Sequence, residues 1–228
     1  MINVYIGFDP REAVAYNVLA SSIQARSSEP VSICPLMLTQ LRMFMTRPRH
    51  QLQSTDFSFS RFLVPFLSGF KGYSIFLDCD MLVLDDISRL WALRDEQYAV
   101  QVVKHDHRPV ETVKFLGEPQ SRYEKKNWSS VMIFNNAKCG MLSPEYVNSA
   151  TGLDLHQFKW LKDDSLIGAL PNRWNHLVGY DPKTADVSLA HYTLGGPYFP
   201  EYANCEYSDH WRTELDAACF AGLNPYFR

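Results

Sequence analysis

Apolar and polar positions fall into blocks along the first third of the chain, and the blocks have the lengths of strands and helices. Short continuous apolar runs predict strands, whereas apolar side chains at helical spacing predict helices. The expected strands cover 2–7, 31–36 and 73–77, and the expected helices cover 11–25 and 57–70. Because strands and helices alternate, we expect an open α/β sheet covered by helices.

Residue types refine two of the expected helices. Pro65 lacks a backbone N–H and therefore predicts a bend within the helix over 57–70. Asp85 and Asp86 precede a further apolar run, and one of them is expected to cap a helix there.

The second half of the chain gives shorter and weaker patterns. Apolar runs predict strands, and one amphipathic run predicts a closing helix. The expected strands cover 98–103, 130–134 and 187–190, and the closing helix covers 209–220. A polar stretch over 104–127 is either an excursion over a ligand cleft or a solvated loop.

Composition narrows the class of protein. The 228 residues are 46% hydrophobic and 21% charged, with a formal net charge of −3, so nothing indicates a nucleic-acid partner. Five scattered cysteines without C-x-x-C spacing disfavour a disulfide framework or a zinc site and favour a reducing compartment. No signal-peptide pattern opens the chain, and no apolar run approaches the ~20 residues of a membrane span. We expect a cytoplasmic protein.

Two carboxylates, Asp78 and Asp80, follow the strand expected over 73–77. Like charges at this spacing raise each other's pKa, whereas a divalent cation removes the penalty. Oxygen ligands favour Mg²⁺ or Mn²⁺, and a histidine in the set would favour Mn²⁺. His191, which follows the apolar run over 187–190, is the candidate.

The ends of the expected strands also mark a place for a ligand. In open α/β sheets, ligands bind beyond the carboxyl ends of the strands. Phe8 and Asp9 stand at one such end, and Asp78-Cys79-Asp80 stands at another. The two segments are therefore candidates for one site.

Several blocks together resemble glycosyltransferase family 8. In that family an arginine-bearing helix precedes an apolar strand that ends in D-x-D, and a closing loop begins with histidine and contains glycine. The similar blocks are 60–65, 75–87, 129–135, 163–167 and 191–198. The likeness extends from residue 2 to about residue 199. It implies the GT-A fold, a Rossmann-like nucleotide-diphospho-sugar transferase fold with a mixed central sheet, and a divalent metal.

The resemblance also implies roles for matching residues. Asp78, Asp80 and His191 would ligate Mn²⁺ or Mg²⁺. Asp163 and Asp164 would lie beside the transferred sugar, although they could instead begin a helix over 165–170. The residues expected to contact the donor are Phe8, Asp9, Arg11, Arg61, Asp78, Cys79, Asp80, Gly195 and Gly196.

The implied activity is transfer of a hexose from a nucleotide-diphosphate sugar, expected to be a UDP-sugar, to a hydroxyl of a saccharide or other acceptor. The resemblance implies retention of the anomeric configuration. We expect one domain over 1–228, with 1–103 binding the nucleotide and 104–228 supplying acceptor contacts and the C-terminal helix.

The sequence departs from the family pattern at two places. The closing loop usually supplies a lysine, and here it reads Gly196-Pro197-Tyr198, so either Arg11, Lys104 or Lys126 replaces it or the phosphate is bound less firmly. In the acid-amide-acid run, Asp164 stands at the amide and Ser165 at the second acid.

Three other functions compete with this interpretation. A sugar-1-phosphate nucleotidyltransferase would need a glycine-rich loop after the first strand, and 7–11 holds a single glycine. An aspartyl phosphatase of the haloacid dehalogenase type would place its D-x-D after the first strand. A catalytically silent nucleotide-sugar-binding module would also fit the missing lysine.

Overall fold

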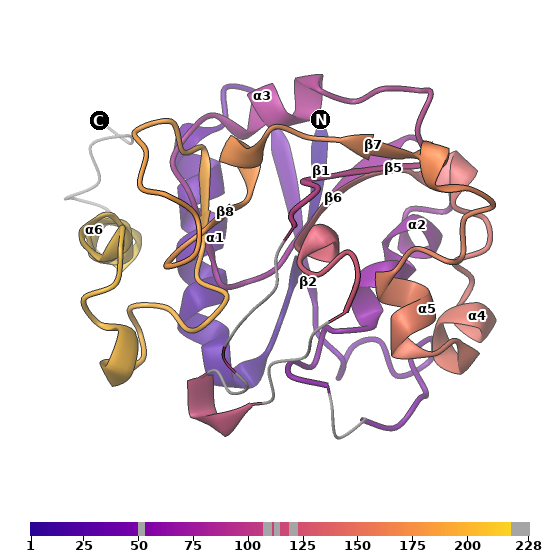
Figure 1. Cartoon of the computed structure of the whole chain (residues 1–228), viewed down its shortest axis with the longest axis horizontal. Coiled ribbons are helices and arrows are strands. Elements are labelled where there is room, and N and C mark those ends of the chain that lie inside the picture. Colours follow the sequence, from indigo (N-terminus) through magenta and orange to yellow (C-terminus); the bar gives the residue numbers. More distant parts are fainter. Residues whose placement is uncertain (50–52, 107–110, 112–114, 119–122, 220–228) are drawn as a thin grey trace.

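The computed structural model describes residues 1–49, 53–106, 111, 115–118 and 123–219, and these form a mixed α/β structure (Figure 1). Its central sheet has six strands in the order β2-β1-β3-β6-β5-β7. The bounds are β1 Ile2–Gly7, β2 Val31–Leu36, β3 Tyr73–Leu77, β5 Val100–Val102, β6 Val131–Asn135 and β7 Ile167–Ala169. The expected single domain with a mixed central sheet is confirmed.

Parallel and antiparallel pairs are mixed in this sheet. β1 runs parallel to both β2 and β3, and β5 runs parallel to β7. β6 runs antiparallel to β3 and β5. Because β1 and β3 are parallel neighbours, the residues that follow each of them meet at the same sheet edge, as expected.

A second sheet of three short strands adjoins the first. Its order is β4-β9-β8, with β4 Met81–Val83, β8 His176–Leu177 and β9 Leu189–His191. β4 follows β3 after only three residues, 78–80, so the acidic pair occupies the connection between the two sheets.

The helices are α1 Ala13–Arg26, α2 Val64–Leu67, α3 Ile87–Ala92, α4 Pro144–Ser149, α5 Gly152–His156 and α6 Ser208–Cys219. The caps explain several starts. Asp86 accepts from the backbone N–H of Ser88 and begins α3, so the expected cap is confirmed. Thr151 and Asp154 form a capping box at α5. No helix among the described residues combines the length and apolar character needed to cross a bilayer.

One expected helix is wrong in extent. The helix expected over 57–70 is a 3-10 turn, Ser60–Leu63, followed by α2, which ends before Gly69 and Phe70 with their positive φ angles. Pro65 lies in the first turn of α2, where its missing N–H is tolerated, so it starts this helix instead of bending a longer one.

The helix over 165–170, given above as the alternative role of Asp163 and Asp164, does not form. One 3-10 turn, Asp164–Leu166, leads directly into strand β7. Pairing of β7 with β5 outweighs the local preference for a helix, because it satisfies backbone groups along an otherwise open edge of the sheet.

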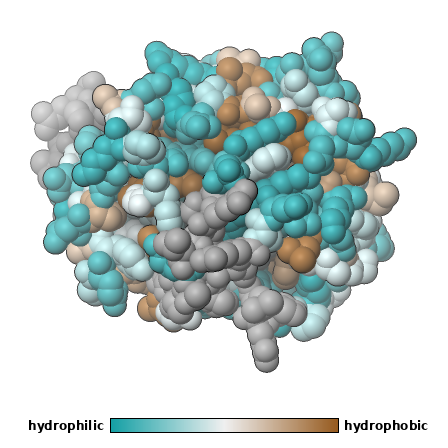
Figure 2. Space-filling model, in the orientation of Figure 1, coloured by the Kyte–Doolittle hydropathy of each residue, from teal (hydrophilic) through white to brown (hydrophobic). Residues whose placement is uncertain are grey.

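The core lies between the central sheet and its helices. Ile75, Phe76 and Leu77 of β3 are completely buried, which agrees with the expectation of a strand covered on both faces. On the outer side, α6 packs on α1, where Arg26 and the buried carboxylate of Glu214 form an ion pair of 2.6 Å. The face in Figure 2 is mostly hydrophilic.

Gly7, at the end of β1, lies so close to the Phe57 ring that a side chain at this position would clash with it. A Cβ built there would lie 2.3 Å from Cδ2 of Phe57, which is buried. We predict that Gly7→Ala lowers the free energy of unfolding by about 1–3 kcal/mol through overpacking. Urea denaturation measures the change. Gly140→Ala is the control, since its Cβ would meet nothing within 4 Å, and equal stabilities of the two variants would contradict the prediction.

Candidate active site

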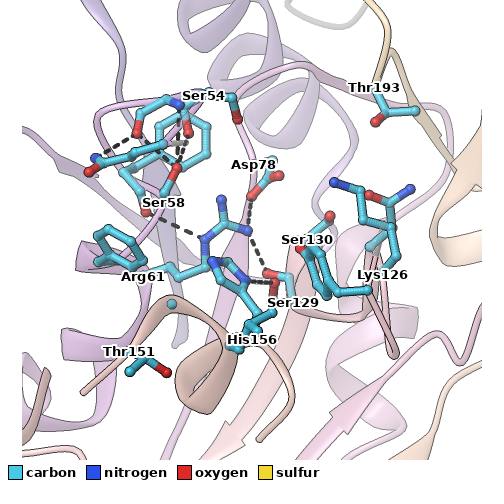
Figure 3. A pocket seen from close by; sticks show the side chains of 18 of the residues that line it. Ser54, Ser58, Arg61, Asp78, Lys126, Ser129, Ser130, Thr151, His156 and Thr193 are labelled. Carbon is cyan, nitrogen blue, oxygen red and sulfur yellow. Dashed lines mark hydrogen bonds and ion pairs between the residues drawn. The ribbon is translucent and has the colours of Figure 1, made fainter. Parts of the chain in front are cut away.

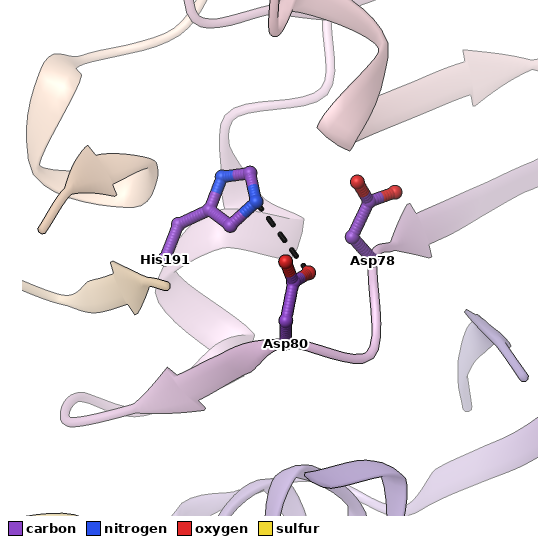
Figure 4. Close-up of side chains that lie close together, drawn as sticks. All are labelled: Asp78, Asp80 and His191. Carbon is purple, nitrogen blue, oxygen red and sulfur yellow. Dashed lines mark ion pairs between the residues drawn. The ribbon is translucent and has the colours of Figure 1, made fainter. Parts of the chain in front are cut away.

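Asp78, Asp80 and His191 converge where the two sheets meet (Figure 4). Asp80 immediately precedes β4, and His191 ends β9. In the antiparallel β4–β9 pair, Met81 lies opposite His191, and the Asp80 carbonyl accepts from Tyr192 N at 2.8 Å. All three side chains are buried, and one potential ligand atom from each lies within 4.8 Å of the others.

Asn175 orients the imidazole of His191. The Asn175 side chain is completely buried, with Oδ1 2.9 Å from Nδ1 of His191 and Nδ2 donating to the carbonyl of Asn127. His191 therefore donates through Nδ1 and directs Nε2 towards Asp80, 3.5 Å from its Oδ1. Sequence reasoning missed Asn175, which has no local signal.

Arg61 is paired with Asp78 at the wall of the site (Figure 3). Its Nη1 lies 2.7 Å from Oδ1 of Asp78 and donates to the carbonyl of Ser129 at 2.9 Å. The guanidinium also lies near the rings of Phe57 and Phe76. Both charged side chains are buried, so each removes part of the cost of burying the other.

A cavity of about 750 Å³ opens beside these residues. Its volume falls within the range of small-molecule and cofactor sites. The walls come from both halves of the chain: from Arg47, Asp78 and Asp80, and from residues within 53–61, 123–130, 149–156 and 191–193. Asp78, Asp80, His191 and Arg61 all line it, so the structure brings these four predicted residues together.

His156 lines the same cavity and was missed from the sequence. Its Nδ1 lies 2.8 Å from Oγ of Ser129, and its ring packs against Phe59, Phe62 and Tyr123. Burial lowers the pKa of His156 well below its usual value, and the charges of Arg61 and Lys126 lower it further. The imidazole is therefore neutral near pH 7.

The first strand end lies next to the cavity. Asp9 is 1% exposed and accepts from the backbone and side chain of Arg11 and from the backbone of Asp56. Burial acts to raise the pKa of Asp9, but these hydrogen bonds outweigh it, and the net effect is a lowered pKa. Arg11 also donates to the carbonyl of Ser54, which lines the cavity, and pairs with Glu118. The ring of Phe8 packs edge-on against Tyr16.

The closing loop approaches the cavity through Thr193, which lines it. Gly195 has a φ of 148°, and Gly196 packs so closely on the Tyr198 ring that a Cβ would lie 2.3 Å from it. The Tyr198 hydroxyl donates to the buried carboxylate of Glu12 at 2.6 Å, which ties the loop to the start of α1.

The closing loop lacks the lysine expected from the resemblance, and the structure shows where its candidate replacements lie. It also shows where the middle residue of the D-x-D motif lies. Of Arg11, Lys104 and Lys126, only Lys126 lines the cavity. The Cys79 side chain points into the hydrophobic core, where burial raises its pKa well above the usual value. Any contact of Cys79 with a ligand would therefore involve its backbone.

Asp163 and Asp164 lie elsewhere. Asp163 accepts from Ser165 N and caps the 3-10 turn that follows. The Asp164 side chain is 71% exposed and pairs with Lys125 at 2.6 Å. Both border a separate surface depression. The structure thus does not bring these two carboxylates to the cavity with Asp78, Asp80 and His191.

No protein-family model matches the sequence. Protein CDI of Arabidopsis thaliana is 46% identical over 223 residues, which are 93% of this chain and 85% of that protein. The chain belongs to the CDI family.

Solved structures of glycosyltransferases share the fold of this CDI-family chain. The galactosyltransferase LgtC, solved with donor and acceptor sugar analogues, is 12% identical with a TM-score of 0.56, and the match covers 95% of this chain and 96% of that chain. The glycosyltransferase GlyE of Streptococcus pneumoniae TIGR4 is 13% identical with a TM-score of 0.62 and a coverage of 94% and 60%.

A third structure, the bifunctional glycosyltransferase WbbM, is 16% identical with a TM-score of 0.65. The match covers 94% of this chain and 49% of WbbM, so the chain spans about half of that protein's length. These likenesses confirm the expected GT-A fold. Membership of glycosyltransferase family 8 itself stays a prediction.

The neutral imidazole of His156, which is partly buried in the cavity wall, predicts a pH dependence of stability. Its folded pKa is lowered, so below about pH 6.5 the unfolded chain binds the proton that the folded chain refuses. The contribution of His156 to the free energy of unfolding is therefore complete above that pH. It decreases as the pH falls, by at most about 1.4 kcal/mol per pH unit. His156→Gln should flatten the slope between pH 6.5 and 5 relative to the parent chain. His210→Gln, which changes an exposed side chain of α6, should not. Urea denaturation across this range measures both, and parallel slopes for all three proteins would refute the assignment.

Proposed function

We propose that the chain is a glycosyltransferase that moves a hexose from a nucleotide-diphosphate sugar, a UDP-sugar, to an acceptor hydroxyl. The observation that carries this proposal is the cluster of Asp78, Asp80 and His191, which lines a cavity of about 750 Å³ on the GT-A fold. The solved relatives in fold are glycosyltransferases, which supports the reaction class.

The three side chains fit a divalent cation. Two carboxylates and one imidazole form a donor set suited to Mn²⁺ or Mg²⁺, with Mn²⁺ favoured by the nitrogen ligand. Asn175 holds His191 in the tautomer that a metal requires. When bound, the cation supplies positive charge that stabilises the diphosphate leaving group.

Other residues of the chain bind the donor in this proposal. Arg61 and Lys126 place two positive charges on the cavity wall, where the sugar and phosphates of the donor lie. Phe8, Asp9 and Arg11, at the neighbouring strand end, contact the uracil and ribose. Thr193 and the backbone of Gly195 and Gly196 approach the diphosphate, and the backbone of Cys79 contributes to the same segment. Residues 1–103 thus supply most of the nucleotide contacts and 104–228 most of the acceptor contacts.

The cavity contains few groups that could take part in covalent catalysis. Of the described residues, the carboxylates that line it are Asp78 and Asp80, which the proposal assigns to the metal. Retention would then proceed by attack of the acceptor hydroxyl on the face from which the diphosphate leaves. Asp163 and Asp164 contribute to such a reaction only if the bound complex differs from the arrangement described above.

The position of Asp163 and Asp164 outside the cavity favours a second candidate, a nucleotide-sugar-binding module without catalytic activity. Neither Asp163 nor Asp164 lines the cavity, and the closing loop lacks the lysine that usually accompanies it. The two candidates share the donor site and differ only in turnover. Metal-dependent hydrolysis or transfer of the sugar decides between them.

We predict that UDP binds in the presence of Mn²⁺ and that Asp80→Asn weakens this binding on the order of a hundredfold. The variant removes the negative charge of a metal ligand but keeps its size, so the loss is electrostatic. Isothermal titration of UDP with and without Mn²⁺ measures the effect. Asp209→Asn, an exposed residue of α6, is the matched control and should bind like the parent chain.

The outcomes of this titration separate the alternatives. Binding that is independent of Mn²⁺ or unchanged by Asp80→Asn would overturn the metal assignment. Absence of UDP binding would overturn the donor assignment, and other nucleotides would then be titrated. Incubation of the chain with UDP-glucose, UDP-galactose and Mn²⁺, followed by assay of released UDP, tests turnover. Release that Asp80→Asn abolishes excludes the silent module.

A further inference from the structure

Arg47 lines the cavity beside residues 149–153, and its position is fixed by several contacts. Its Nη1 donates to the carbonyls of Val147 and Ala150 at 2.7 and 3.0 Å. Its backbone N–H donates to Oδ1 of Asn148, and its guanidinium carbon lies 3.8 Å from the centre of the Phe59 ring. The guanidinium is therefore held rigidly at the end of α4.

Arg47 has no acid to balance its charge within the part of the chain that the structure describes. Arg61, the other arginine of the cavity wall, pairs with Asp78. Arg11 and Arg49 pair with Asp9, Asp56 and Glu118 outside it. Burial lowers the pKa of Arg47, and no described carboxylate acts to raise it. This direction of the pKa agrees with the absence of an acidic partner among the described residues.

The hydrogen-bonding groups of Arg47 are also only partly used. Nη1 makes both carbonyl contacts, and no described residue accepts from Nε or Nη2. A guanidinium with such an open edge presents two N–H donors in the geometry that matches the two oxygens of a carboxylate or a phosphate. The Phe59 ring on its face prevents the side chain from turning freely.

A continuous wall joins Arg47 to the proposed metal site. The Phe59 ring lies against His156, His156 contacts Ser129 Oγ, and the Ser129 carbonyl accepts from Arg61. In Figure 3, Thr151, next to the Arg47 segment, and Thr193, next to His191, stand on opposite sides of the cavity. A ligand at the metal site can therefore extend along this wall towards Arg47.

We propose that the Arg47 end of the cavity binds an anionic group of the substrate, a carboxylate or a phosphate, carried either by the transferred sugar or by the acceptor. This inference rests on the proposed function, because it assumes that a donor occupies the metal end. It adds a charge requirement to a substrate whose identity is otherwise open.

Matched ligand pairs test the inference in two arms, both measured by isothermal titration with Mn²⁺. The donor arm compares UDP-glucuronic acid with UDP-glucose, which differ in one carboxylate. The acceptor arm compares methyl glucuronide and glucose 6-phosphate with methyl glucoside, with and without saturating UDP. In one arm we expect a preference of about tenfold or more for the anionic ligand. The arm that shows it identifies the source of the charge.

Variants assign the preference to Arg47. Arg47→Gln should abolish it, whereas Arg42→Gln, an exposed arginine outside the cavity, should leave it unchanged. Arg47→Lys keeps the charge without the two-pronged geometry and should reduce the preference severalfold, which decides the question if Arg47→Gln fails to fold. Thermal denaturation identifies such failure.

Absence of a preference in both arms, or a preference that survives Arg47→Gln, would overturn the inference. Failure of the proposed function has a different signature, the loss of UDP binding. In that case the acceptor arm without nucleotide still measures whether Arg47 selects an anion.

Discussion

Two carboxylates one residue apart are buried between two sheets, and the surrounding structure is arranged to make that burial tolerable. Isolated buried charges of the same sign are strongly unfavourable. Arg61 lies 2.7 Å from Asp78, and His191 lies 3.5 Å from Asp80, so each carboxylate has its own partner on a different element. These partners are held in turn by the carbonyls of Phe57 and Ser129 and by the side chain of Asn175. The electrostatics of the pair thus accounts for polar contacts deep in both halves of the chain.

The large sheet determines where this charge can be placed. β1 and β3 run parallel, so the segments after Gly7 and Leu77 share one edge. The antiparallel strand β6 brings Ser129 and Ser130 to the same edge from the second half of the chain, since Leu77 pairs with Val131. The cavity therefore depends on contacts between residues that are distant in sequence, and local structure alone could not form it.

The sequence was informative where the signal is local. Strands 2–7, 31–36 and 73–77 agree with β1, β2 and β3 residue for residue, because each is a short, mostly apolar run between turns. The Asp78-Cys79-Asp80 motif and His191 were identified for the same reason, helped by a family resemblance. Residues whose roles arise from tertiary neighbours, such as Arg47, His156 and Asn175, could not be found this way. In the stretch after Asp163, a correct capping signal led to a wrong helix, because pairing with β5 is decided by residues far away in the chain.

The connection over residues 78–80 has a mechanical consequence. Asp78 belongs to the end of the large sheet, whereas Asp80 and His191 belong to the small sheet of β4, β8 and β9. A cation bound by all three side chains would link two sheets that share no backbone hydrogen-bond ladder. Binding of the cation would then be thermodynamically coupled to packing of the small sheet on the large one. A substitution that destabilises β9 would therefore also lower the affinity for the cation, even if it changes no ligand residue.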